Sequence, residues 1–122
     1  MNKKDDCIFC KIIDGKIPSK KAFEDEEVLA FHDIHPIAPV HFLIVPKEHF
    51  DSLAQAEPRH QVLLGKIMLL APKLALENGL DDGFRIIVNT GAGGHQEVFH
   101  LHLHVTGGHK QSPRMSETLQ KL

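Results

Sequence analysis

The sequence predicts a single α+β domain with an antiparallel five-stranded sheet, one long helix and one short helix. Three observations lead to this fold class. Five short runs rich in β-branched and aromatic residues are separated by turn residues. One longer segment, residues 58–78, has the apolar spacing of a helix. The 122 residues suit one domain in length, and neither a linker nor an internal repeat divides them.

The N-terminal half is expected to hold the short helix and three strands. Residues 7–14 (CIFCKIID) place apolar residues on a helical stripe, and Gly15 follows as a stop signal. Short strands are expected at residues 22–24 and 28–33, on either side of an acidic turn. Residues 40–45 (VHFLIV) predict the next strand, which a proline closes. The last two of these strands suit an antiparallel pair.

The long helix, residues 58–78, begins at a proline suited to a first turn and ends before Gly79. Pro72 inside it is expected to kink the helix or to mark a local irregularity. A strand is expected after it at residues 84–89, and Met68 is expected in the core. The predicted apolar face of the helix consists of Val62, Leu63, Ile67, Leu70, Leu74 and Ala75.

Three of the ten histidines alternate along the last predicted strand, residues 98–106. Because successive side chains of a strand point to opposite faces, His100, His102 and His104 would share one face. Neighbouring imidazoles disfavour each other's protonation, so a neutral central ring could act as a nucleophile. The adjacent rings could orient it or donate protons, and the glycine-rich loop at residues 90–94 offers backbone N–H groups to a phosphate.

Two other interpretations of the histidine pattern remain open. Any half-exposed strand alternates polar and apolar residues without carrying chemistry, although three histidines in strict alternation favour a site. Three histidines could also hold a catalytic zinc with an open coordination position, but that interpretation does not account for the glycine-rich loop.

Charge and hydropathy exclude several classes of protein. The formal charge of −2 and a pI near 6.5 argue against a nucleic-acid-binding surface, which is usually strongly basic. No apolar run approaches the roughly 20 residues that span a membrane, and no signal peptide follows the polar N-terminus. A cytoplasmic protein with no membrane partner is therefore expected. We expect residues 1–6 and about 110–122 to be loosely ordered.

The two cysteines, Cys7 and Cys10, are three residues apart. In a reducing compartment this spacing predicts half of a metal site or a redox pair, with two ordinary buried thiols as the remaining alternative. Zinc is favoured because the chain has histidines that could complete a Cys₂His₂ set. The isolated histidines His32, His35, His60 and His109 are expected on the surface, and His95, next to the glycine-rich loop, is a candidate for phosphate contact.

The segment His100–Thr106 (HLHLHVT) resembles the His-φ-His-φ-His-φ-φ signature of the histidine triad family, in which φ is hydrophobic. The resemblance covers most of the chain and points to bacterial-type members of the Hint-like branch. The matching segments are Ile12-Ile13, Ile17-Pro18, Ala30-Phe31-His32-Asp33-Ile34, Pro36, Ala38-Pro39, His41-Phe42-Leu43, Pro46-Lys47, His49, Leu64-Gly65, Asn89 and Gln96.

The resemblance implies an enzyme that acts at the α-phosphate of purine nucleotide derivatives, those of AMP or GMP, through a covalent nucleotidyl-histidine. His102 is similar to the nucleophile, and His104 to the residue that contacts the phosphate and assists the leaving group. His41 and His100 are similar to supporting histidines. The implied nucleotide contacts are Phe9, Phe31 and Ile34 at the base, Asp33 at the ribose, and Asn89, Gln96 and Glu97 with His102 and His104 at the phosphate and leaving group.

The resemblance also implies a metal and a partner. In relatives with the N-terminal cysteine pair, a structural zinc is held at positions that match Cys7, Cys10, His49 and His100. Family members are homodimers whose sheets join into one larger sheet. Two features depart from animal Hint proteins: Glu97 replaces a serine that helps the leaving nitrogen, and the C-terminal tail lacks a tryptophan.

The leading hypothesis is therefore a hydrolase of nucleoside phosphoramidates, similar to adenosine 5′-monophosphoramidases. A second hypothesis keeps the nucleophile but changes the substrate to dinucleoside polyphosphates or other nucleotide esters. A third is a zinc-stabilised nucleotide-binding or interaction protein with little catalysis. Comparing turnover and binding across these nucleotides separates the three hypotheses.

Overall fold

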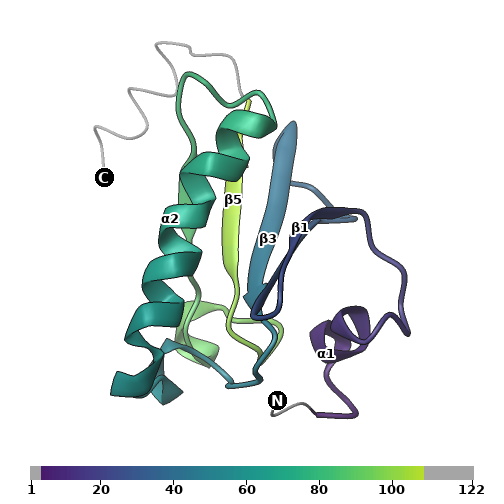
Figure 1. The fold of residues 1–122 in the computed structure, drawn as a ribbon, viewed down its shortest axis with the longest axis vertical. Helices are drawn as coiled ribbons and strands as arrows, with labels where there is room; N and C mark the ends of the chain where they lie inside the picture. The colour runs from purple at the N-terminus through teal and green to yellow at the C-terminus, as the bar shows by residue number, and fades with distance from the viewer. Residues whose placement is uncertain (1–3, 109–122) are drawn as a thin grey trace.

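The computed structural model of the chain describes residues 4–108, and it is shown in Figure 1. Its regular elements in chain order are α1 (Ile8–Ile13), β1 (Lys21–Glu24), β2 (Val28–His32), β3 (Val40–Pro46), the short 3₁₀ helices η1 (Leu53–Gln55) and η2 (Pro58–His60), α2 (Gln61–Glu77), β4 (Arg85–Ile87), η3 (Ala92–Gly94) and β5 (Leu103–Gly107). Among these elements, no helix has both the length and the apolarity needed to cross a bilayer.

The five strands form one antiparallel sheet in the order β1-β2-β3-β5-β4. β3 lies at its centre, where Leu43 is opposite His104 and Ile44 is opposite Leu103. The predicted α+β class, the five strands and the two helices are confirmed. The predicted loosely ordered ends fall outside the described residues, apart from residues 4–6, of which residues 5 and 6 form a turn before α1.

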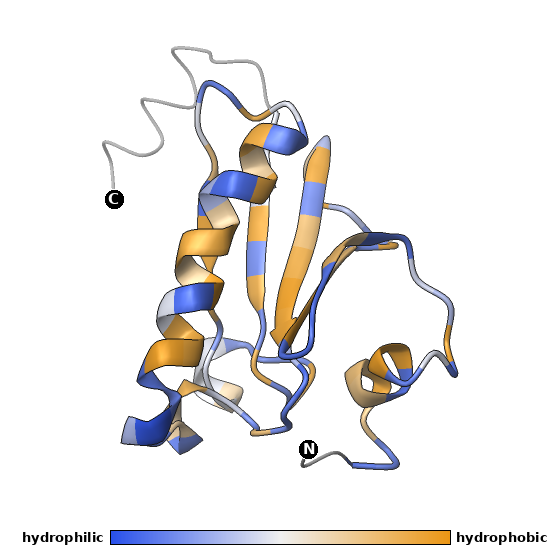
Figure 2. Ribbon diagram, in the orientation of Figure 1, coloured by the Kyte–Doolittle hydropathy of each residue, from blue (hydrophilic) through white to orange (hydrophobic). Residues whose placement is uncertain are grey.

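β2 and β3 send alternate side chains to two different cores. One core lies between the sheet and α2, which runs alongside β5 and β3 in Figure 1. The other lies on the opposite face, beneath α1. Figure 2 shows the apolar residues concentrated on the strands and the helices. The α2 core includes Val28, Ala30, Phe42, Ile44, Leu103 and Val105, and the α1 core includes Phe9, Cys10, Leu29, Phe31, Leu43 and Val45.

The buried stripe of α2 is narrower than predicted. Ile67, Leu70 and Leu74 face the sheet, but Val62 is 84% exposed and Met68 is 48% exposed, so both were wrongly expected in the core. Val62 precedes Ile67 by five residues, about 140° around a helix of 3.6 residues per turn, which turns it away from the sheet. The helix continues through Pro72, which lies on the exposed side.

The last strand begins later than predicted. β5 starts at Leu103, whereas residues 98–106 were expected to be one strand. The chain before it bonds elsewhere: the N–H of Leu101 donates to the carbonyl of Phe50 at 2.9 Å, outside the sheet ladder. β4 is likewise limited to Arg85–Ile87 of the expected residues 84–89.

His60 was expected on the surface, but it is only 2% exposed. Its Nδ1 accepts a hydrogen bond from the N–H of Glu57 at 2.9 Å, and its Nε2 lies 3.1 Å from a carboxylate oxygen of Glu48. Its ring stacks on Phe50, with ring centres 4.2 Å apart. The ring is therefore part of the capping box of η2, the turn that leads directly into the long helix. Of the other three, His35 is exposed, His32 is half-buried and His109 lies outside the described residues.

Candidate functional site

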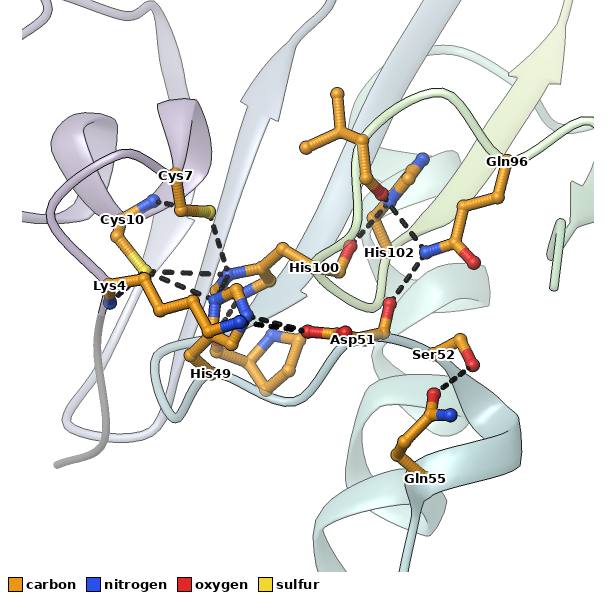
Figure 3. Close-up of polar contacts among 12 residues, drawn as sticks. Lys4, Cys7, Cys10, His49, Asp51, Ser52, Gln55, Gln96, His100 and His102 are labelled. Atoms are coloured by element: carbon orange, nitrogen blue, oxygen red, sulfur yellow. Dashed lines mark hydrogen bonds and ion pairs between the residues drawn. The ribbon is translucent and has the colours of Figure 1, made fainter. Parts of the chain in front are cut away.

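Four possible metal ligands converge between α1 and the end of β3. Cys7 caps α1 and Cys10 lies in its first turn, while His49 follows β3 and His100 precedes β5. The two sulfur atoms and the two Nδ1 atoms all lie within 4.8 Å of one another. Figure 3 shows both rings directed towards the sulfur atoms. The sequence-predicted set of four residues is therefore brought together.

The spacing of these atoms suits a tetrahedral zinc. The Cys7 Sγ lies 3.4 Å from the Nδ1 of His100, and the Cys10 Sγ lies 3.4 Å from the Nδ1 of His49. The two Nδ1 atoms are 3.1 Å apart. Zinc bonds of about 2.3 Å to sulfur and 2.05 Å to nitrogen at tetrahedral angles require edges of about 3.6 Å and 3.3 Å, respectively. The four donors need little movement to meet this geometry.

The outer nitrogen of each ligand histidine has its own acceptor. The Nε2 of His100 donates to the carbonyl of Pro46 at 2.8 Å, and the Nε2 of His49 donates to the carboxylate of Asp51 at 3.0 Å. These bonds place the ring proton on Nε2 and leave the Nδ1 lone pair for a metal. Asp51 could have been identified from the sequence as a carboxylate two residues after a ligand.

The thiols need a positively charged partner in order to ionise. Burial raises the pKa of Cys10 to about 11. Both cysteines are buried and free, so no disulfide joins them. A dication would hold both as thiolates, and the convergence of two imidazoles favours metal ligation over a redox pair.

A cavity of about 700 Å³ lies on the α1 face of the sheet. Its apolar end is formed by α1, β2 and the turn after α1, and its polar end by the histidines and the glycine-rich loop. Of the predicted catalytic and nucleotide-binding residues, those that line the cavity are Phe9, Phe31, Asp33, Ile34, His41, Asn89, His95, Glu97, His102 and His104. Ser19, which no sequence pattern indicates, also lines the cavity and supplies a hydroxyl.

His100 and Gln96 do not line the cavity. The ring of His100 is fully buried among the metal ligands, so the alternating histidines do not share one surface. Gln96 is 6% exposed and its amide bonds to the main chain behind the glycine-rich loop. The three histidines separate because the chain joins the sheet only at Leu103, after the first two of them.

One main-chain contact fixes the protonation of His102. Its Nδ1 donates to the carbonyl of His100 at 2.7 Å, so the ring proton sits on Nδ1 and the lone pair sits on Nε2. Burial lowers the pKa of the ring, which is packed edge-on against Phe9 with ring centres 5.1 Å apart. His102 therefore lines the cavity as a neutral ring with an unprotonated Nε2.

A chain of hydrogen bonds fixes the opposite tautomer on His104. The N–H of Ile37 donates to the Nδ1 of His41 at 3.1 Å, so the proton of neutral His41 is on Nε2. That Nε2 lies 2.9 Å from the Nδ1 of His104, to which it donates. The proton of His104 is then on its own Nε2. The rings of His102 and His104 are adjacent, with centres 4.9 Å apart. His102 therefore offers the lone pair of its Nε2, and His104 offers the N–H of its Nε2.

The same chain argues against a second metal. Asp33, His41 and His104 also place three possible ligand atoms within 4.8 Å. A metal would need the lone pair of His41 Nε2, but the Ile37 N–H already occupies the lone pair on Nδ1. A neutral imidazole cannot offer both. We therefore interpret this cluster as a hydrogen-bonded group, in which the Asp33 carboxylate lies 3.5 Å from His41 Nε2.

The glycine-rich loop is largely bonded to itself. Gly91 has the positive φ of 72° that starts the turn into η3. The N–H groups of Gly94 and His95 donate to carbonyls within the loop, and the Asn89 side chain donates to the carbonyl of Gly94 at 2.8 Å. The N–H of Gly91 donates to the side chain of Gln96. These three N–H groups are therefore already bonded within the loop and to Gln96, and they are not donors to a phosphate.

Acid is expected to lower the free energy of unfolding through His104. Burial and the nearby rings of His102 and His41 lower the pKa of His104 from 6.5 to about 4, although the carboxylate of Asp33 acts in the opposite direction. Between these values the unfolded chain binds a proton that the folded chain does not, so stability is full above about pH 7 and falls as the pH drops towards 4. Urea unfolding at pH 7.5 and pH 5 measures the loss.

His104→Asn should lose less stability over this pH range than the wild type. The difference is at most about 1.4 kcal/mol for each pH unit, the value for one proton. Equal losses in the two proteins would show that His104 does not contribute to acid sensitivity.

Comparisons with known proteins agree on one family. The model of a family described as "Scavenger mRNA decapping enzyme C-term binding" matches residues 6–120. Protein HitA of Neisseria gonorrhoeae is 57% identical over 103 residues, which cover 84% of this chain and 96% of that protein. A 14 kDa zinc-binding protein of Zea mays is 47% identical over 107 residues, 86% of this chain and 84% of that protein. The crystal structure of a HIT family hydrolase from Legionella pneumophila superposes with a TM-score of 0.84 at 44% identity, covering 88% of this chain and 97% of that one.

Proposed function

Since the chain belongs to the histidine triad family, we propose that it is a hydrolase of nucleoside phosphoramidates, which it attacks at the α-phosphate. One observation carries this proposal: His102 and His104 lie side by side in opposite tautomers at the polar end of the cavity. A lone pair and an N–H donor in adjacent positions are what nucleophilic displacement at phosphorus requires.

In the first step, the Nε2 of His102 attacks phosphorus and the bond from phosphorus to the leaving nitrogen breaks. The amine departs with a proton from solvent, while the Nε2–H of His104 donates a hydrogen bond at the reacting phosphoryl group. Water then attacks the nucleotidyl-histidine, the bond from phosphorus to Nε2 breaks, and the nucleotide leaves as the water releases a proton. The carbonyl of His100 holds the Nδ1 proton of His102 throughout.

The remaining cavity suits a nucleoside. Phe9 and Phe31, whose ring centres are 5.6 Å apart, form an apolar wall on which a purine base can pack. Asp33 follows Phe31 by two residues, lines the same cavity and lies 3.5 Å from His41, so its carboxylate can accept hydrogen bonds from ribose hydroxyls. One carboxylate oxygen of Asp33 already accepts from the N–H of His35 at 2.8 Å, which holds the side chain in place.

The charges of the cavity favour amine leaving groups over polyphosphates. Its described lining contains the carboxylates of Asp33 and Glu97 and no lysine or arginine. A polyphosphate leaving group would add several negative charges without a cation to stabilise them. An amine avoids this repulsion, so the proposal ranks phosphoramidates above dinucleoside polyphosphates.

Steady-state kinetics with matched substrates tests the proposal. We expect kcat/KM for adenosine 5′-phosphoramidate to exceed that for diadenosine polyphosphates by at least about tenfold, a difference of roughly 1.4 kcal/mol in transition-state stabilisation. Guanosine phosphoramidate should also react, because an apolar wall distinguishes purines poorly. Faster turnover of the polyphosphates would favour the second hypothesis. Nucleotide binding without turnover of any substrate would favour the zinc-stabilised binding protein.

We also propose that zinc occupies the Cys7, Cys10, His49 and His100 cluster. The maize relative is named a zinc-binding protein, and the four donors fit a closed tetrahedral site without an open position for substrate. Such a zinc would have a structural role and would join α1 to the sheet. A cytoplasmic location, where thiols stay reduced, suits this site and remains a prediction.

Finally, we propose that the protein is a homodimer that packs along α2. Val62, Leu69 and Leu76 are 65–84% exposed and follow one another at intervals of seven residues, the spacing of a helix-packing seam. Gly65 lies between the first two and leaves room for close approach of a second helix. β4, at the edge of the sheet, is the strand on which a partner's sheet could continue.

The double variant Val62→Glu with Leu69→Glu is therefore expected to be monomeric at concentrations where the wild type is dimeric. Placing two carboxylates in a helix seam removes apolar burial and adds repulsion between like charges. Sedimentation equilibrium gives the mass of each, and Glu77→Lys, on the exposed side of the same helix, is the matched control. A monomeric wild type would contradict the proposed dimer.

A further inference from the structure

Gln96 connects the segment of the metal ligand His49 to the polar end of the cavity. Its Nε2 donates to the carbonyl of Asp51 at 2.6 Å and to the carbonyl of Val98 at 3.0 Å. Its Oε1 accepts from the N–H of Gly91 at 2.8 Å. Figure 3 shows the amide extending towards Asp51. All three contacts are to the main chain, so the side chain is a buried cross-link between two loops.

The cross-link extends directly to the metal cluster. Asp51, whose carbonyl Gln96 holds, uses its carboxylate to accept from the Nε2 of His49. The other nitrogen of His49 lies among the four metal-binding atoms. A continuous path therefore runs from His49 through Asp51 and Gln96 to Gly91. The N–H of Gln96 also donates back to the carbonyl of Gly91 at 3.1 Å, which closes the loop on itself.

The glycine-rich loop that Gln96 holds contributes to the cavity wall. Asn89, His95 and Glu97 surround Gly91 in sequence and all line the cavity beside His102. A shift of Gly91 would displace these three residues relative to the nucleophile. The side chain of Gln96 therefore links the position of the metal ligands to the position of this part of the cavity wall.

We propose that Gln96 is a positioning residue that couples metal binding at His49 to nucleotide binding in the cavity, rather than a residue that contacts the nucleotide. The inference rests on the proposed function only in taking a nucleotide as the occupant of the cavity. Coupling of this kind is reciprocal: a bound nucleotide tightens the metal by the same factor by which the metal tightens the nucleotide.

The first test measures zinc affinity by competition with a chromogenic chelator, with and without saturating AMP. For the wild type we expect AMP to tighten zinc by roughly two- to tenfold, the range that corresponds to one net buried hydrogen bond. Gln96→Ala should reduce this factor to about one. Gln55→Ala is the matched control, since Gln55 lies in the same region and bonds to Ser52 without reaching the loop; it should retain the wild-type factor.

The second test needs no nucleotide and follows hydrogen exchange at the amide of Gly91. Exchange in the zinc-loaded Gln96→Ala protein should be roughly two- to tenfold faster than in the wild type, because the N–H loses its acceptor. Gln55→Ala should exchange at the wild-type rate. If the alanine variant does not fold, Gln96→Met fills a similar volume without either hydrogen-bonding group and serves in its place.

The outcomes separate this inference from the proposed function. Independent binding of AMP and zinc to the wild type would overturn the coupling while leaving the hydrolase intact. A chain that does not bind AMP would count against the proposed function, and the exchange rate of Gly91 would still decide whether Gln96 holds the loop. Unchanged Gly91 exchange in both Gln96 variants would overturn the positioning role.

Discussion

Replacing His102 by alanine is expected to lower kcat for adenosine 5′-phosphoramidate by at least about a thousandfold, the scale on which loss of a covalent nucleophile reduces turnover. His102 is the residue whose ring proton is held on the far nitrogen by a carbonyl, so that Nε2 can form the bond to phosphorus. Neighbouring rings cannot take its place, because His104 carries its proton on the nitrogen that faces the cavity and His100 lies among the metal ligands.

Intact-protein mass spectrometry after acid quench completes this experiment. The wild type should gain the mass of one nucleotidyl group during turnover, and His102→Ala should gain none. Retained AMP affinity and zinc content in the variant serve as controls for its fold. His104→Asn, which keeps an N–H donor, should lose less activity than His104→Ala. Substantial turnover by His102→Ala would refute the proposed nucleophile.

Replacing Cys10 by alanine is expected to have the largest effect on stability. Cys10 is 1% exposed and contacts both ligand histidines at 3.4–3.6 Å. Metal-binding free energy adds to folding free energy, so loss of one of four ligands should cost at least about 3 kcal/mol. For a domain of this size that corresponds to a decrease in Tm of roughly 10 °C.

Chelation provides the control for the Cys10 variant. A strong chelator should lower the Tm of the wild type by a similar amount, yet leave that of Cys10→Ala nearly unchanged, because both treatments remove the same interaction. Thermal unfolding followed by circular dichroism, with zinc content measured in parallel, gives these values. Equal sensitivity of both proteins to the chelator would mean that the four donors do not hold the stabilising metal.

The fold and the metal ligands could be read from the sequence for different reasons. β-branched runs between turn residues predicted the strands, since local patterning and the final sheet agree for β2 and β3. Alternation singled out His100, His102 and His104, and spacing singled out Cys7 and Cys10. The ligand His49 and the remaining nucleotide contacts came from the resemblance to a family. The structure brings the ligands together, and the roles assigned to the cavity residues remain predictions.

The features that the sequence could not predict depend on hydrogen bonds to main-chain atoms. The tautomers of His102 and His104 follow from the carbonyl of His100 and the N–H of Ile37, which no side-chain pattern reveals. The strict alternation of residues 98–106 predicted one strand and one shared face. The chain joins the sheet only at Leu103. Before that residue, the N–H of Leu101 donates to the carbonyl of Phe50 and not to a neighbouring strand. His60 was misplaced for a similar reason, since its partners are a main-chain N–H and a distant carboxylate.

Phe9 and Cys10 are neighbours in α1, and one faces the cavity while the other faces the metal-binding cluster. A six-residue helix has little stability of its own, so its position depends on what it contacts. In a related protein that has lost one of the two cysteines, the remaining ligands would be buried without a metal. The cavity wall made by Phe9 would also be less firmly held. Substitution by bulky apolar side chains at all four ligand positions would restore packing. The four residues should therefore be inherited or lost as a set.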